Sequence, residues 1–306
     1  MQTTLARSVQ FVGMGLHSGR PVRLTLKPAA AGSGIRFRRV DVRDRDGVVP
    51  ARFDAVSDTR LNTRLSNAAG VTVSTVEHLM AAFAGAGLYN VTVDIDGPEV
   101  PIMDGSARRF LRDILEAGLV AQAAPLQVMR IVSDIVHREG DAEVRLSPYN
   151  GLKISFEIAF DEAAIGRQTA SFDMSNGTFA RELADCRTFC RRQDVEAMQA
   201  AGLGLGGTLE NAVVVEGATV LNPEGFRRVD ECVRHKILDV LGDISLVGMP
   251  ILGHYQGVRA GHGPTNRMLR TLFDRPEAYR IETCTPETAR GLPGAGLCPA
   301  DLAKVG

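Results

Sequence analysis

The sequence predicts an α+β protein made of two similar halves. In each half, strand-like runs of alternating apolar and polar residues come first, and helical patterns follow them. Both halves share one order, which is several antiparallel-type strands, a long helix, a strand and a second helix. This order differs from the strict strand–helix alternation of a doubly wound parallel sheet. It indicates a structural duplication, although identity between the halves is poor residue by residue.

The first half is expected to form one α+β domain over residues 1–122. Alternation in PVRLTLKP, GIRFRR and NVTVDID predicts half-buried strands. The run STVEHLMAAFAGAG, residues 74–87, predicts a helix in which Ser74 and Glu77 have the spacing of a capping box and glycines form the end. ARRFLRDILEAG predicts an amphipathic helix that ends at Gly118.

The second half is expected to form another α+β domain over residues 128–306, after a linker, AQAAPLQ. VMRIVSDIVHREG, AEVRLSP and LKISFEIAF predict strands arranged as a meander. A long helix is predicted over residues 231–247, followed by the strand ILGHYQGVRA, the loop GHGP and a helix from about Thr265. Residues of about 190–225, which begin with the short helix RRQDVEAMQAAG, exceed what the duplication needs.

Composition excludes several classes of protein. The chain has 306 residues, 44% of them hydrophobic and 23% charged, with a net charge of −1, which argues against bulk electrostatic capture of nucleic acid. No apolar run is long enough to span a bilayer, and MQTTLARSVQF lacks the apolar core of a signal peptide, so we expect a cytoplasmic protein. Five scattered cysteines fit reduced thiols better than a disulfide framework: Cys186, Cys190, Cys232, Cys284 and Cys298.

The long helix of the second half carries a polar stripe. His235, Asp239 and Asp243 follow one another at intervals of four residues, opposite an apolar face. A histidine and a carboxylate one turn apart can hold a metal ion between them. The same spacing is also ordinary on a solvated helix surface, where it makes a weak ion pair. The helix alone therefore leaves both interpretations open.

Glu77 and His78 stand in a helix that is apolar nearly all round, which predicts burial. The competing interpretations are a capping box for Glu77 and a core histidine bonded to a carbonyl for His78. Buried ionisable groups are costly without partners and cluster at working sites. If the two long helices face each other, His78, His235 and Asp239 form a three-ligand site with one open position, as in catalytic zinc centres, with Glu77 beside it.

A further histidine, His262, lies in GHGP, where flanking glycines let the backbone approach a ligand closely. An ordinary turn residue is the competing interpretation. Asp243 is a candidate to accept a hydrogen bond from such a histidine and to orient it. The run GLGLGG at residues 202–207 lacks the lysine and hydroxyl of a P-loop, so a flexible turn competes with a phosphate cradle. Three histidines stay unassigned: His17, His137 and His254.

Together these residues resemble the bacterial UDP-3-O-acyl-N-acetylglucosamine deacetylases of lipid A biosynthesis. The match runs across nearly the whole chain in the family's order, which is far more specific than any single motif. The stretches that carry it are GMGLHSG at 13–19, STVEHLMAAFAGAG at 74–87, PEVPIMDGSA at 98–107, CRTF at 186–189, LGLGGTLENAVVV at 203–215, VRHKILDVLGD at 233–243 and GHGPTN at 261–266.

The resemblance implies a fold and an activity. The fold is two similar domains, each a mostly antiparallel sheet layered with two helices, with the active site between them. The activity is removal of the acetyl group from UDP-3-O-(3-hydroxyacyl)-N-acetylglucosamine, the committed step towards lipid A. The implied cofactor is one Zn²⁺ ion. Two histidines and a carboxylate can hold Fe²⁺ as well, so the sequence leaves open which metal is bound in the cell. The resemblance also implies a monomer, whose lipid-bearing substrate allows transient membrane contact. From the net charge we expect no nucleic-acid partner.

The resemblance also implies roles for the polar residues. His78, His235 and Asp239 match the metal ligands, and Glu77 matches the general base. His262 matches a histidine that assists as a cation or general acid.

Asp243 matches the hydrogen-bond partner of that histidine, and Thr188 matches a hydroxyl that helps to hold the oxyanion. Lys236 matches a substrate-binding lysine, and Phe189 matches an aromatic residue that contacts the substrate. The segment of about 190–225 matches an insert that forms a passage for the acyl chain. The residues expected on its lining are Val195, Gly207, Thr208, Ala212 and Val214.

Two points stay open at this stage. Some family members have a cysteine near the metal, able to bind a second, inhibitory zinc, where this chain has Asn62; we therefore expect weaker inhibition by excess zinc. A non-catalytic module that binds a UDP-sugar and a metal is the alternative function, although it would need neither Glu77 nor His262. A kinase-like enzyme using GLGLGG on ATP phosphates is a third hypothesis, which the missing lysine opposes.

Overall fold

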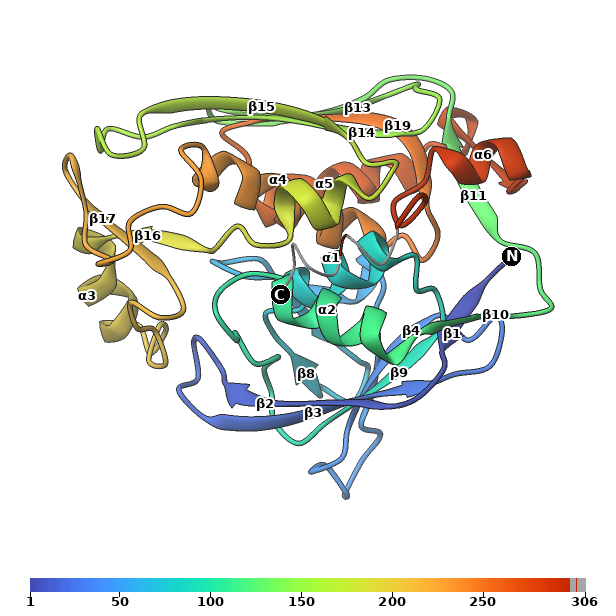
Figure 1. Ribbon diagram of the computed structural model, residues 1–306, viewed down its shortest axis with the longest axis horizontal. Coiled ribbons are helices and arrows are strands. Elements are labelled where there is room, and N and C mark those ends of the chain that lie inside the picture. Colours follow the sequence, from blue (N-terminus) through green and yellow to red (C-terminus); the bar gives the residue numbers. More distant parts are fainter. Residues whose placement is uncertain (298–300, 302–306) are drawn as a thin grey trace.

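The computed structural model describes residues 1–297 and 301, so Cys298 lies outside the described residues. Its secondary structure confirms the predicted α+β class. Two sheets form the outer layers, and the long helices lie between them (Figure 1). One continuous hydrophobic core joins residues of both sheets and of the helices. None of the helices in the described part of the chain is long and apolar enough to cross a membrane.

The first sheet has the strand order β2-β3-β9-β4-β5. Its neighbouring strands are antiparallel except β4 and β9, which are parallel. The predicted alternation is confirmed, because Val22, Leu24 and Leu26 are buried while Arg23 is exposed. The five strands are β2 (Val9–Met14), β3 (Pro21–Pro28), β4 (Ile35–Arg39), β5 (Val48–Pro50) and β9 (Val91–Ile95).

Smaller elements complete this half of the chain. Helices α1 and α2 lie on the side of the first sheet that faces the rest of the molecule (Figure 1). A short ribbon joins β1 to β10, and a three-stranded sheet has the order β6-β7-β8. The elements are β1 (Thr3–Leu5), η1 (Phe53–Ala55), β6 (Val56–Asp58), β7 (Arg64–Ser66), β8 (Thr72–Val73), α1 (Glu77–Ala86), α2 (Arg108–Ala117) and β10 (Leu119–Ala121).

The second sheet runs β12-β13-β19-β11-β20, and β14 pairs with both β15 and β19. The predicted meander is wrong, because β19 lies between β13 and β14. Alternation of apolar and polar residues predicts the two faces of a strand, but it does not predict which strands lie beside it. Here β19, which is distant in sequence, carries glycines that allow it to pack closely against its neighbours. A side chain at Gly257 would overlap the ring of Phe156. The strands are β11 (Gln127–Ile131), β12 (Ile135–Glu139), β13 (Ala142–Ser147), β14 (Leu152–Ala159), β15 (Arg167–Asp173), β19 (Ile251–Val258) and β20 (Tyr279–Thr283).

Helix α4 packs directly on α1 at the centre of the molecule, and α5 packs on α4 (Figure 1). The contact between α1 and α4 is close, since a Cβ atom at Gly242 would overlap the carbonyl oxygen of Glu77. The polar stripe of α4 is therefore buried against α1, which excludes the solvated-face interpretation. The helices and turns of this half are η2 (Phe179–Leu183), α4 (Glu231–Ser245), α5 (His262–Phe273), η3 (Pro276–Ala278) and α6 (Pro286–Arg290).

Two helix starts differ from the prediction. Helix α1 begins at Glu77 itself, so Glu77 cannot be the third residue of a capping box. Its carboxylate instead accepts a hydrogen bond from the backbone N–H of Thr63, while the hydroxyl of Ser74 accepts one from Arg64. Helix α5 begins at His262, so GHGP is the first turn of a helix rather than a loop. At α1, tertiary hydrogen bonds replace the capping box that the sequence suggested.

The predicted excess segment forms a separate lobe at the left of Figure 1. Its glycine-rich turn lies against the loop GMGLHSG of the first half, where Gly206 N–H donates to the carbonyl of Leu16. A Cβ atom at Gly206 would overlap the carbonyl oxygen of Gly15. The glycines thus permit contact between two loops. The lobe contains β16 (Phe189–Arg191), α3 (Arg192–Ala200), β17 (Val213–Glu216) and β18 (Thr219–Val220).

Candidate active site

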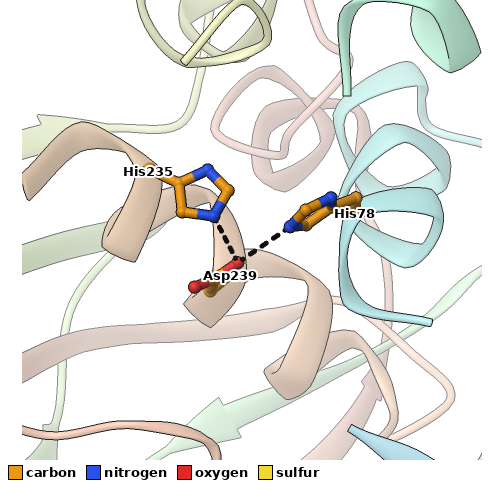
Figure 2. A group of neighbouring side chains, drawn as sticks. All are labelled: His78, His235 and Asp239. Atoms are coloured by element: carbon orange, nitrogen blue, oxygen red, sulfur yellow. Dashed lines mark ion pairs between the residues drawn. The ribbon is translucent and has the colours of Figure 1, made fainter. Parts of the chain in front are cut away.

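Three side chains from the two central helices converge on one point (Figure 2). His78 comes from α1, and His235 and Asp239 come from successive turns of α4. One atom of each, all within 4.8 Å of one another, is available to a metal ion. Oδ1 of Asp239 lies 3.5 Å from Nε2 of His78 and 3.3 Å from Nε2 of His235. All three residues are buried.

His235 is held in the tautomer that a metal ligand needs. Its Nδ1 lies 3.0 Å from the carbonyl oxygen of Cys186, and because a carbonyl can only accept, Nδ1 carries the proton. Burial lowers the pKa of His235 to about 3, against the raising effect of Asp239. The imidazole is therefore neutral at pH 7, and Nε2 presents a lone pair.

These residues fit a metal ion. Oδ1 of Asp239 is buried and has no hydrogen-bond partner among residues 1–297 and 301, although it faces two imidazole nitrogens. A buried carboxylate oxygen without a partner is costly, and a cation among the three atoms would satisfy it. Two imidazoles and one carboxylate with an open position form the donor set of a catalytic metal centre.

Lys236 also reaches this carboxylate, since its Nζ donates to Oδ2 of Asp239 at 2.7 Å. Burial opposes the charged form of Asp239, but His235 and Lys236 hold its pKa well below the ordinary value. Burial likewise opposes the charge on Lys236, and Asp239 nevertheless raises the pKa of that ammonium group. Asp239 therefore stays ionised, with one oxygen bonded to Lys236 and the other facing the two histidines.

Glu77 lies at the start of α1, next to His78 in sequence, and is buried. Its Oε2 accepts the N–H of Thr63 at 3.0 Å. Burial raises the pKa of Glu77, while His262 and His78 oppose that rise. A carboxylate whose pKa is raised above its ordinary value is a better proton acceptor for catalysis than an ordinary surface glutamate.

The predicted hydrogen bond between His262 and Asp243 is present. Nδ1 of His262 lies 2.7 Å from Oδ2 of Asp243, and the other oxygen of Asp243 accepts the hydroxyl of Thr63 at 2.7 Å. Thr63 thus links Asp243 to Glu77, because its N–H binds Glu77 and its hydroxyl binds Asp243. The structure places the general-base candidate and the histidine–aspartate pair within one network.

Thr188 and Phe189 belong to the segment that carries the carbonyl of Cys186. The ring of Phe189 lies edge-on to the ring of His235, with centroids 6.3 Å apart. Thr188 is fixed through its backbone, since its N–H donates to Gly105 at 2.8 Å. Both side chains are half-buried, which leaves them partly accessible near the cluster of His78, His235 and Asp239.

The residues expected along an acyl passage all lie on the lobe of residues 190–225. Val195 is on the half-buried side of α3, Gly207 and Thr208 are exposed, and Ala212 and Val214 are buried at β17. The glycine-rich turn closes this lobe against the first half of the chain rather than forming a phosphate cradle.

Two structural features near the site were not predicted from the sequence. His17, left unassigned, accepts the N–H of Gly204 at its Nδ1, while its own N–H donates to Glu99 at 2.8 Å. Burial lowers the pKa of His17, although Glu99 opposes this. The only indication of a role for His17 in the sequence was its position within the stretch GMGLHSG. The second feature is the buried ion pair between Arg187 and Glu231, which lies next to His235. No local sequence pattern predicts this pair, because its two residues are far apart in the sequence.

Comparisons with known proteins agree with this geometry. A family model described as LpxC, UDP-3-O-acyl N-acetylglycosamine deacetylase, matches residues 2–274. A UDP-3-O-acyl-N-acetylglucosamine deacetylase of Phenylobacterium zucineum is 45% identical over 291 residues, covering 95% of this chain and 99% of the relative. The protein of the same name from Anaeromyxobacter sp. is 44% identical over 302 residues, covering 96% and 98%. That from Pasteurella multocida is 42% identical over 284 residues, covering 92% and 93%.

The matched residues include the candidate metal-ligand cluster, Glu77 and the His262–Asp243 pair. A family match over residues 2–274, together with relatives that are 42–45% identical over more than nine-tenths of the chain, is specific. The chain belongs to the family of UDP-3-O-acyl-N-acetylglucosamine deacetylases.

Proposed function

We propose that this protein removes the N-acetyl group from UDP-3-O-(3-hydroxyacyl)-N-acetylglucosamine by zinc-assisted hydrolysis, the committed step of lipid A biosynthesis. The observation that carries the proposal is the partnerless Oδ1 of Asp239 between His78 and His235, with Glu77 beside it. We further propose that the protein is a cytoplasmic monomer. Its domains would be residues 1–122 and 128–306, with the insert at about 190–225.

His78, His235 and Asp239 would hold the metal. When bound there, Zn²⁺ would lower the pKa of an adjacent water to about 7 and polarise the amide carbonyl. Fe²⁺ suits the same donor set. Glu77 takes the proton from the attacking water, in keeping with its raised pKa.

His262 acts beside the reacting carbonyl as a cation. Burial by itself lowers the pKa of His262, but Asp243 outweighs burial and raises it to about 9, so the ring is charged at neutral pH. This charge and the hydroxyl of Thr188 stabilise the developing oxyanion. His262 then protonates the departing amine, for which Glu77 is the competing acid.

The rest of the substrate would lie along the half-buried side chains next to the cluster. Lys236 and Phe189 contact the substrate there. The acyl chain follows the lobe of residues 190–225, with a lining of Val195, Gly207, Thr208, Ala212 and Val214.

The test is acetate release from the acylated UDP-sugar before chelation, after chelation, and after return of one equivalent of zinc. We expect activity to vanish with the chelator and to return with zinc. Activity that is indifferent to chelation would remove the metal mechanism and leave the substrate assignment standing. A lack of activity under Zn²⁺ and Fe²⁺ alike would contradict the whole proposal and favour a module that binds without turnover.

A further inference from the structure

The peptide group between Cys186 and Arg187 is held at both ends by side chains of α4. Its carbonyl oxygen accepts the Nδ1–H of His235 at 3.0 Å, and its N–H donates to Oε1 of Glu231 at 2.9 Å. Glu231 and His235 are four residues apart, so they lie one above the other on one face of the helix. One peptide plane therefore connects the first turn of α4 to the metal-ligand histidine.

Glu231 also binds the side chain of Arg187 through a forked ion pair. Nε of Arg187 donates to Oε1 at 2.9 Å, and Nη2 donates to Oε2 at 3.2 Å. Oε2 accepts a further hydrogen bond from the N–H of Arg227 at 2.7 Å. Arg187 and Glu231 are each only 1% exposed. The carboxylate is therefore fixed in position by several charge-assisted bonds away from water.

A buried ion pair is weak support for stability alone, because desolvation offsets much of the attraction; its best-attested use is to specify one arrangement. Here the arrangement is that of the peptide plane. Since a trans peptide is planar, its N–H and C=O point in opposite directions, and fixing the N–H also fixes the carbonyl. A turn of this plane would break the bonds to Glu231 and His235 together.

We propose that Glu231, with Arg187, is a positioning residue for the metal ligand His235, acting through the Cys186–Arg187 peptide. The held carbonyl keeps Nδ1–H of His235 bonded and its Nε2 directed at Asp239. Thr188 and Phe189 follow this peptide directly, so the same contact sets their entry into the site. The inference rests on the proposed metal function of His235.

The test compares Glu231→Gln with a matched control, Glu224→Gln. Glutamine at 231 places an amide N–H₂ group against the guanidinium donors, which loosens the peptide plane. Glu224 binds Nη1 of the same arginine but makes no contact with the peptide, and its side chain is 53% exposed. Zinc affinity is measured by competition with a chelating indicator, and the ligand geometry by the visible absorption bands of the Co²⁺-loaded protein.

We expect Glu231→Gln to bind zinc about 10-fold or more weakly, as is typical when the partner of a ligand is altered, and to shift the Co²⁺ bands. Glu224→Gln should match the unaltered protein in both measurements. A purely structural role for Glu231 would change the unfolding midpoint without moving the zinc affinity or the Co²⁺ bands of the folded protein.

The outcomes separate this inference from the proposed function. If the unaltered protein does not bind zinc, the zinc mechanism and this inference both fail, while the substrate assignment stands. If it binds zinc and Glu231→Gln binds it equally with unchanged Co²⁺ bands, only the positioning role is overturned. If Glu231→Gln does not fold, Arg187→Lys replaces it in the test. Lysine keeps the positive charge and the backbone N–H, but it cannot donate the two parallel hydrogen bonds of the guanidinium group to Glu231. Severalfold weaker zinc binding is then expected, and unchanged binding and bands would overturn the inference.

Discussion

Nδ1 of His262 donates a hydrogen bond to Oδ2 of Asp243 across 2.7 Å, between two buried side chains. Burial alone would lower the pKa of His262. The charge of Asp243 and this hydrogen bond prevail and raise that pKa to about 9. The charge on His262 at neutral pH therefore depends on Asp243. Replacing Asp243 should change both the catalytic activity and the stability of the protein.

Replacing Asp243 with asparagine should move the basic limb of the pH–rate profile. In the unaltered protein, kcat/KM should fall on the basic side near the pKa of His262, about 9. In Asp243→Asn burial is no longer opposed by this carboxylate, so the limb should move towards pH 6.5 or below. The measurement is kcat/KM from pH 5 to 10, with His262→Ala as the variant that lacks the limb. A limb that stays at the same pH in Asp243→Asn would exclude His262 as its source.

The same pair should make stability fall at alkaline pH. The pKa of His262 is about 9 when folded and about 6.5 when unfolded. Its contribution, on the order of 3 kcal/mol at 1.36 kcal/mol per pH unit, is thus fully present below pH 6.5 and is lost as the pH rises through 9. Urea unfolding at a series of pH values should show this decline, and Asp243→Asn should show a flatter curve. Parallel curves would contradict the linkage.

Glu77→Gln should abolish proton transfer while the metal site stays intact. Glutamine still offers an oxygen to the N–H of Thr63, so the local fold should persist. Without the base, kcat should fall by roughly 10²–10⁴-fold. Zinc content of the purified variant serves as the control and should equal that of the unaltered protein. Near-normal kcat would exclude Glu77 as the base, whereas loss of zinc would assign it to the metal site instead.

Gly242→Ala should destabilise the fold although alanine favours helices. The added Cβ atom would overlap the carbonyl oxygen of Glu77, which forces α1 and α4 apart. Such overpacking costs about 1–3 kcal/mol, more than the helix propensity gained. Gly261→Ala is the matched control, because a Cβ atom there has no neighbour within 4 Å and the backbone is extended. Equal unfolding midpoints for the two variants would show that the helices tolerate separation.

Excess zinc should inhibit this protein weakly. Asn62 is buried and neutral next to Thr63, the residue whose N–H binds Glu77. A neutral amide is a poor zinc ligand, whereas a thiolate is a good one. We expect activity to survive several equivalents of zinc, and Asn62→Cys to become sensitive. Strong inhibition of the unaltered protein just above one equivalent would show that a second zinc site exists without a cysteine.

The strands and helices followed from local patterns in the sequence. The alternation in β3 predicted which side of that strand is buried, and the structure agrees. The apolar periodicity of α4 predicted the helix and its buried apolar face, but not that the polar stripe with His235, Asp239 and Asp243 is buried as well. The order of strands in the second sheet did not follow. Placing β19 between β13 and β14 depends on contacts such as Gly257 with Phe156, which lie about one hundred residues apart and leave no local pattern.

For the site, the sequence by itself determined which residue types were present and that His235 and Asp239 share one face of a helix. Helical geometry acts within a few residues, so spacing alone sufficed for that pair. The residues alone placed His78 with this pair only on the condition that the two helices face each other, and the tertiary structure decided that condition. Only the tertiary structure showed that Thr63 binds both Glu77 and Asp243, and that Glu231 binds the peptide that contacts His235. These contacts form when α1 packs on α4 and distant segments meet, because burial leaves their polar groups no other partners.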